Sequence, residues 1–409
     1  MSENTRSKFF YGYIVVAGCF AIQAMGIGTS GSFGVFFKAL LFEFGWSRAT
    51  ISGASSAAFL VSGSLAILVG NLNDRFGPRL IMAVTGACFG LGLLLMSQLT
   101  TVWQLYLIYG VLVGIGLSSI DVIALTTTAR WFVKRRGMMT GIVKVGTGTG
   151  QFIMPLMTSI FLATYGWRTA YLIIGMLALI LIISSGQLLR RDPSQKGLLP
   201  DGDEKTMASD LHLSEVGVSL HEAVLTKQFW MICVINLIAM SCLISVFVHI
   251  VPHAMDLGIS AIVAAGILST IGGVSIVGRL GTGVAIDSIG NKKLMIMCFL
   301  ILIASFLWLQ VSKELWMLYV FAVVYAFAHG GYFTVISPLV AELFGISSHG
   351  VLFGIVVFSG TIGAAIGPIL AGHIFDMVSS YRLVFFILAG FAVAGLILTS
   401  LLRPVVTEA

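Results

Sequence analysis

Long apolar stretches alternate with short polar segments along almost the whole chain. Runs of about 20 residues, enough for a helix to cross a hydrocarbon layer about 30 Å thick, recur from about Phe10 to about Leu402. Twelve such runs fit the sequence. The pattern predicts an all-α membrane protein with twelve transmembrane helices in two six-helix bundles.

One long hydrophilic stretch divides these runs into two groups. We expect an N-terminal bundle over residues 1–189, a cytoplasmic linker over 190–227 and a C-terminal bundle over 228–409. The spans of the first group are expected over 10–35, from about 49 to 70, 79–97, 102–128, from 137 onward, and 169–189. Those of the second group are expected over 228–252, 260–286, 292–311, 315–343, 349–375 and 381–402. Within the linker, the run from Ser219 to Glu222 is a capping box that predicts a short interfacial helix.

Several residues recur at a fixed distance along the chain. Gly283, Asp287 and Gly290 follow Gly70, Asp74 and Gly77 by 213 residues. The same offset relates further pairs, namely Trp103 with Trp316, Tyr106 with Tyr319, Gly141 with Gly354 and Pro155 with Pro368. One offset shared by separate regions indicates a duplicated unit of six spans, and we expect the binding site between the two halves.

Composition and charge narrow the class of protein. Of the 409 residues, 58% are hydrophobic and 10% are charged, whereas about 25% of a soluble domain is charged. Most of the 23 lysines and arginines fall on one side of the predicted spans, together with both termini. The positive-inside rule makes that side cytoplasmic in the inner (plasma) membrane. The net charge of +6 therefore indicates topology, with a lipid bilayer and not a nucleic acid as the partner.

The chain lacks the sequence patterns of common enzyme classes. It contains no His-Glu-x-x-His, no Gly-x-Ser-x-Gly and no phosphate-binding loop, and its five cysteines lie in apolar spans without a close pair. We expect no catalytic activity, no cofactor and no metal. Transport would then depend on an ion gradient or on substrate exchange.

Arg279 is the strongest candidate for a binding residue. Eight residues separate it from Asp287 at the predicted boundary, which places it about 12 Å inside the hydrocarbon layer. The run 260–286 holds no acidic residue to neutralise it. An arginine at this depth usually faces a cavity and binds an anion. The alternative is an arginine that pairs with a neighbouring helix and stabilises the fold.

Lys144 and Asp121 admit two interpretations. Each lies about seven residues, or roughly 10 Å, inside the same boundary, on consecutive antiparallel spans. They can form a salt bridge that leaves Arg279 alone to meet the substrate. Otherwise Lys144 is a second anion-binding group and Asp121 a proton-coupling residue.

Other interior or boundary residues are candidates for binding and coupling. His249 and Asp256, near the external end of span seven, are candidates for proton coupling because a histidine titrates near pH 6.5; the alternative is a loop-edge cluster exposed to water. Further candidates for substrate contact are Ile27, Ser118, Tyr332, Phe333 and Thr361. The glycines at positions 141, 146, 148 and 150 predict a face that packs tightly on a neighbouring helix.

Two sets of motifs resemble known families. The Gly-Asp-Gly turns at Asp74 and Asp287 resemble the signature of the major facilitator superfamily, and they imply gating at the cytoplasmic side. The run Gly45-Trp46-Ser47-Arg48, and the run from Trp131 to Arg136 with the glycines that follow it, resemble the monocarboxylate transporter family and the related bacterial oxalate:formate antiporters.

This resemblance implies that an arginine in span eight receives the substrate carboxylate, and Arg279 stands at that place. The sequence departs from the relatives at three positions, since Gly31 and Gly360 stand where they have a lysine and Ser275 stands where they have an aspartate. One guanidinium binds one carboxylate as a bidentate fork.

We therefore expect a monomeric secondary transporter of a small monocarboxylate, such as lactate or pyruvate, with proton symport by alternating access. The alternatives are an exchanger of the oxalate:formate type, a carrier of another small organic anion, and a membrane enzyme or sensor.

Overall fold

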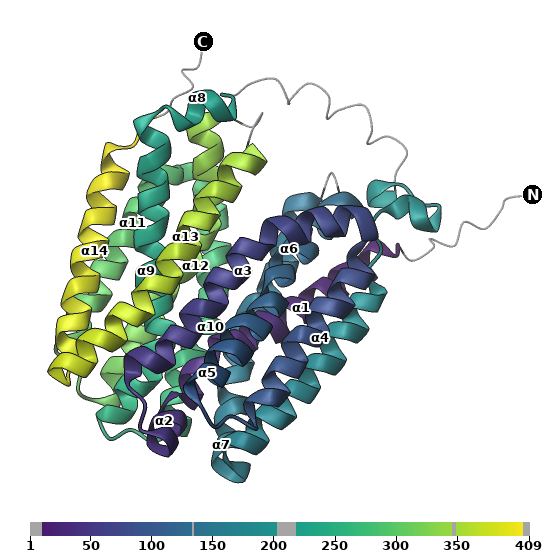
Figure 1. The fold of residues 1–409 in the computed structure, drawn as a ribbon. Coiled ribbons are helices and arrows are strands. Elements are labelled where there is room, and N and C mark those ends of the chain that lie inside the picture. Colours follow the sequence, from purple (N-terminus) through teal and green to yellow (C-terminus); the bar gives the residue numbers. More distant parts are fainter. Residues whose placement is uncertain (1–9, 133–134, 203–217, 346–348, 404–409) are drawn as a thin grey trace, which may run out of the picture.

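The apolar runs form long helices (Figure 1), and the computed structural model describes residues 10–132, 135–202, 218–345 and 349–403. The N-terminal half consists of α1 (Gly12–Gly31), α2 (Phe33–Phe44), α3 (Arg48–Phe76), α4 (Pro78–Met96), α5 (Val102–Leu105), the π-helical η1 (Tyr106–Val113), α6 (Gly114–Trp131) and α7 (Arg136–Leu188). The C-terminal half consists of α9 (Lys227–Asp256), α10 (Ala261–Ile289), α11 (Asn291–Leu309), α12 (Leu315–Phe344), α13 (His349–Val378) and α14 (Tyr381–Leu401).

The segment between the halves contains short helices. They are η2 (Pro193–Lys196), η3 (Pro200–Gly202) and α8 (Leu220–Val224). The predicted capping box opens α8, because the Ser219 hydroxyl accepts from the Glu222 N–H and the Glu222 carboxylate accepts from the Ser219 N–H. These bonds, chiefly the one from the Ser219 backbone, lower the pKa of the Glu222 carboxyl.

The helices agree with twelve crossings. In the described ranges, 11 helical stretches are long and apolar enough to span a membrane. One of them belongs to α7, whose 53 residues turn back at Gly166, where φ is 77° and ψ is 163°. A helix of that length would extend about 80 Å, more than twice the hydrocarbon thickness, so α7 supplies two spans.

Two predicted spans end several residues before the observed helices do. The first span continues beyond Val35 through α2 to Phe44, with a local break at Ser32, and the second continues beyond Gly70 to Phe76. The first difference has a physical reason, since Lys38 forms an ion pair with Asp256 and Glu43 one with Arg168. Charges with partners do not end a helix.

The positive φ angles at the turns recur at the 213-residue offset that relates the two halves of the sequence. Gly77 and Gly290 end α3 and α10 with φ of 83° and 87°. Gly45 and Gly258, also 213 residues apart, have φ of 65° and 86°. Gly166 and Ser379 continue the series with 77° and 51°. The duplicated unit therefore includes turns where the residue type has changed.

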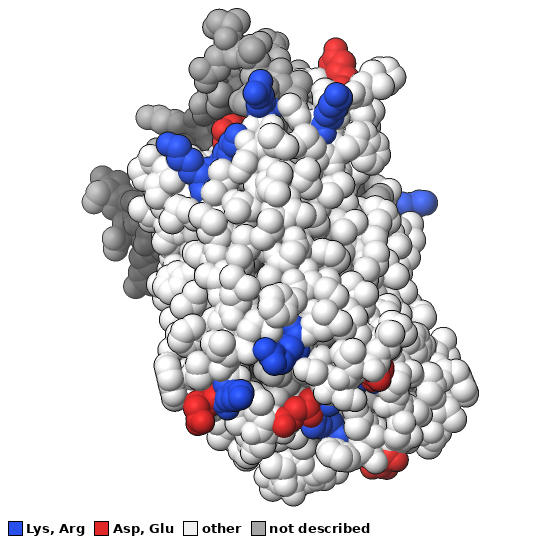
Figure 2. All heavy atoms as spheres, turned by 90° about the vertical axis from the view of Figure 1, so that its left-hand side faces the viewer, with Lys and Arg blue, Asp and Glu red and all other residues white. Residues whose placement is uncertain are grey.

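Each half has its own buried apolar cluster. One is formed by residues between Val15 and Leu189 with Val248, and the other by residues between Ala223 and Leu402 with Val35. On the face drawn in Figure 2, a wide uncharged band separates charged groups at the two ends of the molecule. This band fits the hydrocarbon layer of a multi-pass membrane protein.

The two bundles meet along α3 with α13 and along α7 with α10. Figure 1 shows that they converge at the end that holds α2 and diverge toward the start of α1 and the end of α14. A side chain added at Gly141, Gly281 or Gly354, toward the divergent end, would meet no atom within 4 Å. The contact between the halves is therefore asymmetric along the axis of the bundle.

Candidate functional site

Arg279 lies where α10 and α12 pack backbone to backbone. A side-chain carbon added at Gly278 would lie 3.1 Å from the carbonyl oxygen of Ala326, and one added at Gly330 would overlap the carbonyl of Ser275. These small residues permit the close crossing. The crossing brings the side chains near Gly330 on α12 to the helical turn of α10 that carries Arg279.

Among the described residues, the Arg279 guanidinium has one hydrogen-bond partner and no ion-paired acid. Its Nη1 donates to the main-chain carbonyl of Lys144 on α7, at 3.1 Å. Its Nε is buried without a hydrogen-bond partner. Within the described ranges, no carboxylate lies within ion-pair distance of it, and Asp121 acts on it only through space. The residue therefore contacts a neighbouring helix, as the alternative interpretation required, but its charge stays without a counter-ion.

Asp121 and Lys144 form the salt bridge that equal depth on adjacent spans had suggested. Lys144 Nζ lies 2.5 Å from Asp121 Oδ1. The Asp121 side chain is 52% exposed and that of Lys144 is 34% exposed, although both residues are inside membrane-spanning helices. Because Arg279 binds the backbone of Lys144, this pair belongs to the same region between the halves.

Gln23 on α1 completes the cluster and is not among the residues predicted from the sequence. Its Nε2 donates to Asp121 Oδ1 at 2.6 Å, and its Oε1 accepts from the Thr147 hydroxyl at 2.7 Å. Gln23 is fully buried. A single amide in the apolar first span is a usable signal, because a polar group in hydrocarbon needs a partner.

His249 and Asp256 join a network between the halves at the convergent end. His249 is 2% exposed, and its ring nitrogens lie 2.9 Å from the Tyr381 hydroxyl and 2.9 Å from the Pro368 carbonyl. The interpretation of His249 as part of a water-exposed loop edge is therefore wrong. Asp256 forms ion pairs with Lys38 and with Arg48, the latter at 2.8 Å.

Arg48 connects this network across the interface. Its Nη1 donates to the Tyr381 hydroxyl at 2.8 Å, and its guanidinium lies 3.7 Å from the Phe375 ring centroid. Its backbone N–H and that of Ala49 donate to the Asp376 carboxylate at 3.0 and 2.9 Å. The sequence offered Arg48 only as part of a family motif and gave no sign of its partners.

The remaining candidates separate into two groups. Tyr332 is buried and donates to Asn236 Oδ1 at 2.6 Å, so it is held within its own half. Ser118 is buried and lines an apolar groove between α3, α4 and α6. By contrast, Ile27 lies one helical turn from Gln23, Phe333 is exposed, and Thr361 packs against Gly63 across the interface. The latter three are the candidates that the fold leaves near the interface or near Arg279.

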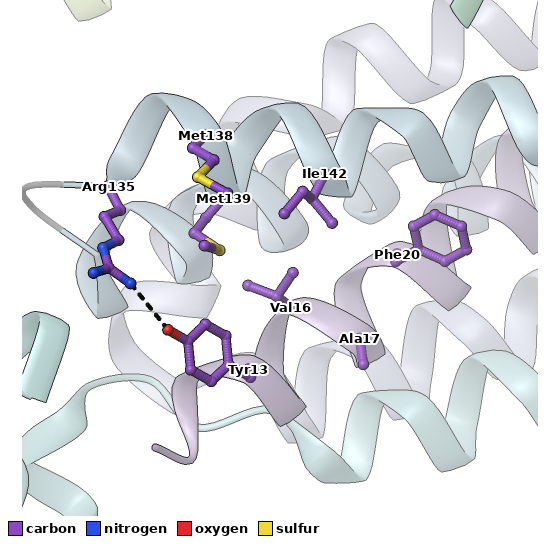
Figure 3. Close-up of a pocket in the computed structure, with 8 residues that line it drawn as sticks. All are labelled: Tyr13, Val16, Ala17, Phe20, Arg135, Met138, Met139 and Ile142. Carbon is purple, nitrogen blue, oxygen red and sulfur yellow. Dashed lines mark hydrogen bonds between the residues drawn. The ribbon is translucent and has the colours of Figure 1, made fainter. Parts of the chain in front are cut away.

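Two further features lie apart from Arg279. Asp74 and Asp287 stand in α3 and α10, but their side chains are outside the part of the chain that the structure describes. A cavity of about 520 Å³ lies between α1 and the start of α7. Arg135 and Tyr13 line it, and Arg135 donates to the Tyr13 hydroxyl at 3.2 Å (Figure 3). None of the predicted site residues lines this cavity.

Comparison with known proteins agrees with this architecture. The family model of the Major Facilitator Superfamily matches residues 16–285 and 275–408. Monocarboxylate transporter 12 of Rattus norvegicus is 26% identical over 407 residues, which cover 93% of this chain and 83% of the relative. Monocarboxylate transporter 13 of the same organism is 26% identical over 387 residues, with 94% and 87% covered.

A solved structure shows the same fold. It is that of a bacterial homolog to the human lysosomal transporter Spinster, in an inward-facing and occupied conformation, with a TM-score of 0.77, 16% identity and 97% of each chain covered. The predicted resemblance is thus confirmed by the family match and by the curated relatives. The chain belongs to the Major Facilitator Superfamily and is a membrane transporter, not an enzyme, with relatives in the monocarboxylate transporter family.

Proposed function

We propose that this transporter carries a small monocarboxylate of the lactate or pyruvate kind, together with a proton, by alternating access. The observation that carries the proposal is the Arg279 guanidinium, which has an unpartnered Nε and no ion-paired acid among the described residues. A charged group at membrane depth is costly unless something neutralises it. A substrate carboxylate supplies both the missing charge and acceptors for the guanidinium.

The charge of the cluster supports one carboxylate per substrate. Asp121 and Lys144 neutralise each other, so the cluster with Arg279 has a net charge of +1. While Asp121 is ionised, a monoanion brings this charge to zero. A dianion would leave one negative charge without a partner inside the membrane-spanning part of the molecule, which is unfavourable.

Asp121 is the proposed coupling residue. Protonation of its carboxyl removes the counter-ion of Lys144 and adds one positive charge beside Arg279. The protonated cluster has a net charge of +2 and binds an anion more strongly. A proton and a monocarboxylate that enter together leave the cluster at +1, the charge that it has when empty and ionised. His249 and Asp256 are the second candidates, because they belong to the network that joins the halves at the convergent end.

The distribution of cations gives the proposed orientation. With both termini cytoplasmic, the convergent end faces outward and the divergent end opens to the cytoplasm. The turns at Asp74 and Asp287 then lie at the mouth of the open side, where we place the inner gate. We expect the protein to act as a monomer in the plasma membrane.

Uptake of labelled lactate into proteoliposomes, with and without an inward proton gradient, tests the proposal. We expect accumulation only with the gradient. Arg279→Gln should lower uptake at least a hundredfold, and Arg279→Lys should also be impaired because an ammonium keeps the charge but loses the fork. Near-normal affinity in folded Arg279→Gln protein would remove Arg279 from the site.

An exchanger of the oxalate:formate type is the second candidate. It is favoured by the partial exposure of Lys144, which can offer a second cation beside Arg279. Oxalate uptake that needs internal formate but no proton gradient would establish it.

A further inference from the structure

We propose that His329 and Gln151 select a carboxylate that carries a second oxygen at the neighbouring carbon, a 2-hydroxy or 2-keto acid, over an unsubstituted acid of the same length. This inference rests on the proposed function, because it assigns the rest of the substrate once Arg279 holds the carboxylate. It names two binding residues from α12 and α7 that the sequence did not assign to substrate contact.

His329 is a buried ring with an unused polar atom. It is 1% exposed, and its Nδ1 has no hydrogen-bond partner. Aromatic side chains enclose it, with the rings of Phe247 and Phe333 centred 4.9 and 5.2 Å from its own. A buried polar atom without a partner is unfavourable, and it is rare in native proteins unless it has a function.

His329 lies beside the turn that holds the proposed carboxylate-binding residue. Gly330 directly follows it, and a side-chain carbon there would lie 3.0 Å from the backbone nitrogen of Arg279. Arg279 also acts on the imidazole through space. The unpartnered atoms of both side chains, Nε and Nδ1, thus belong to the same crossing of α10 and α12.

Gln151 brings a third unused atom from the other half. It is 7% exposed, and its Oε1 has no partner. A side-chain carbon added at Gly31 would lie 3.7 Å from Gln151 and 3.6 Å from Phe247. Phe247 in turn contacts His329. Gln151 from the N-terminal half and Phe247 from the C-terminal half therefore both lie beside Gly31, and Phe247 connects this position to His329.

The chemistry of these groups fits an oxygen beside a carboxylate. An imidazole nitrogen donates or accepts according to its tautomer, and the amide of Gln151 offers an acceptor and two donors. A hydroxyl or keto oxygen can use one donor of this kind, and a hydroxyl also satisfies an acceptor. An acid with only methylene and methyl groups leaves all of them unsatisfied, which the site should disfavour.

The test compares lactate with propionate, which has the same carbon chain without the hydroxyl. In proteoliposomes of the wild-type chain we expect KM for propionate to exceed KM for lactate by roughly tenfold. His329→Phe should raise KM for lactate about tenfold and leave KM for propionate unchanged, so that the preference disappears. Gln151→Leu should also reduce the preference for lactate over propionate.

Two further variants separate binding from packing. Tyr325→Phe removes another buried polar group of α12, the hydroxyl that donates to the Leu243 carbonyl at 2.9 Å, and it should keep the tenfold ratio. His329→Gln restores a hydrogen-bonding side chain at this position, and it should recover part of the tenfold KM ratio between propionate and lactate. Equal changes of both KM values in His329→Phe, or none, would overturn the inference and leave the proposed function intact. Wild-type protein that takes up neither acid would overturn the proposed function, and the inference with it.

Discussion

Asp121 and Lys144 show how exposure changes the energy of an ion pair at membrane depth. A fully buried pair loses about 3–5 kcal/mol when one partner is removed, because the other charge stays uncompensated. Here half of the Asp121 side chain and a third of the Lys144 side chain are exposed. The remaining charge is therefore only partly enclosed by protein, so the cost should be nearer to that of a surface pair.

Lys144→Met should therefore lower stability by only about 1 kcal/mol, and Asp121→Asn with Lys144→Met should recover most of it. Thermal unfolding of the purified protein measures both changes. Lys313→Met, at an exposed position outside the spans, is the matched control. The double variant should still transport a monocarboxylate without proton coupling. A folded double variant that binds no substrate would place Lys144 in the site.

The sequence predicted how far along their helices these residues lie, but not the orientation of their side chains. Counting from a span boundary predicted equal depth for Lys144 and Asp121, in agreement with their salt bridge. It could not show which way each side chain points, because that depends on how the helices rotate against one another. The partner of Gln23 and the isolation of His329 Nδ1 depend on this rotation, so neither could be read from the pattern.

At the scale of helices, a close glycine contact joins the same two helices within each half of the repeat. A methyl group at Gly150 on α7 would overlap the carbonyl oxygen of Ala24 on α1, and one at Gly363 on α13 would overlap that of Leu237 on α9. The second contact follows the first by 213 residues, since Gly363 corresponds to Gly150 and Leu237 to Ala24. The predicted tight packing of the small-residue face is confirmed for Gly146, Gly148 and Gly150, whereas Gly141 has no neighbour.

Gly150→Ala should destabilise the protein by about 1–3 kcal/mol, because the added methyl group meets backbone and not a mobile side chain. Gly141→Ala, on the same helix with free space, should have no effect or a slightly stabilising one. Unfolding midpoints of the two variants give the comparison. Similar losses in both would mean that helix contact is not what Gly150 provides.

The elements themselves were largely predictable. Hydropathy and the repeat give the number and order of spans, because each crossing must bury its backbone in a helix about 20 residues long. The ends of α2 and α3 were missed. Lys38 and Glu43 look like boundary charges in the sequence, and only their partners, Asp256 and Arg168, explain why the helix continues through them.

At the scale of the whole molecule, one ionic network closes the convergent end. Arg48 and Lys38 of the N-terminal half hold Asp256 of the C-terminal half, and Asp376 binds the start of α3. Sequence patterns identify the two halves, but they cannot tell which end is closed. Both states of an alternating-access carrier have the same sequence and differ by only a few kcal/mol.

Arg48→Gln should shift the population toward a state that is open at this end. A cysteine at Val248, which is buried in the cluster of the opposite half, should report the shift in a chain without its native cysteines. We expect its reaction with a water-soluble maleimide to be about tenfold faster in Arg48→Gln, since a charge-assisted contact contributes about 1.5–3 kcal/mol. Arg382→Gln, exposed at the same end, should leave the rate unchanged. Equal rates in both variants would show that the Arg48 contacts do not hold the end closed.

The hydrogen bond from Arg279 to the main-chain carbonyl of Lys144 affects the return step of the transport cycle, in which the carrier reorients without substrate. If the binding cation has no partner after substrate leaves, reorientation of the empty carrier is unfavourable, because an unneutralised charge would have to cross the membrane-spanning region. Such a carrier is an obligatory exchanger. In this protein a carbonyl of the opposite half accepts a hydrogen bond from the guanidinium, and this bond can supply part of the stabilisation that substrate provides. We therefore expect the return step to proceed without a counter-substrate, so that net flux follows the gradient and trans-stimulation is weak.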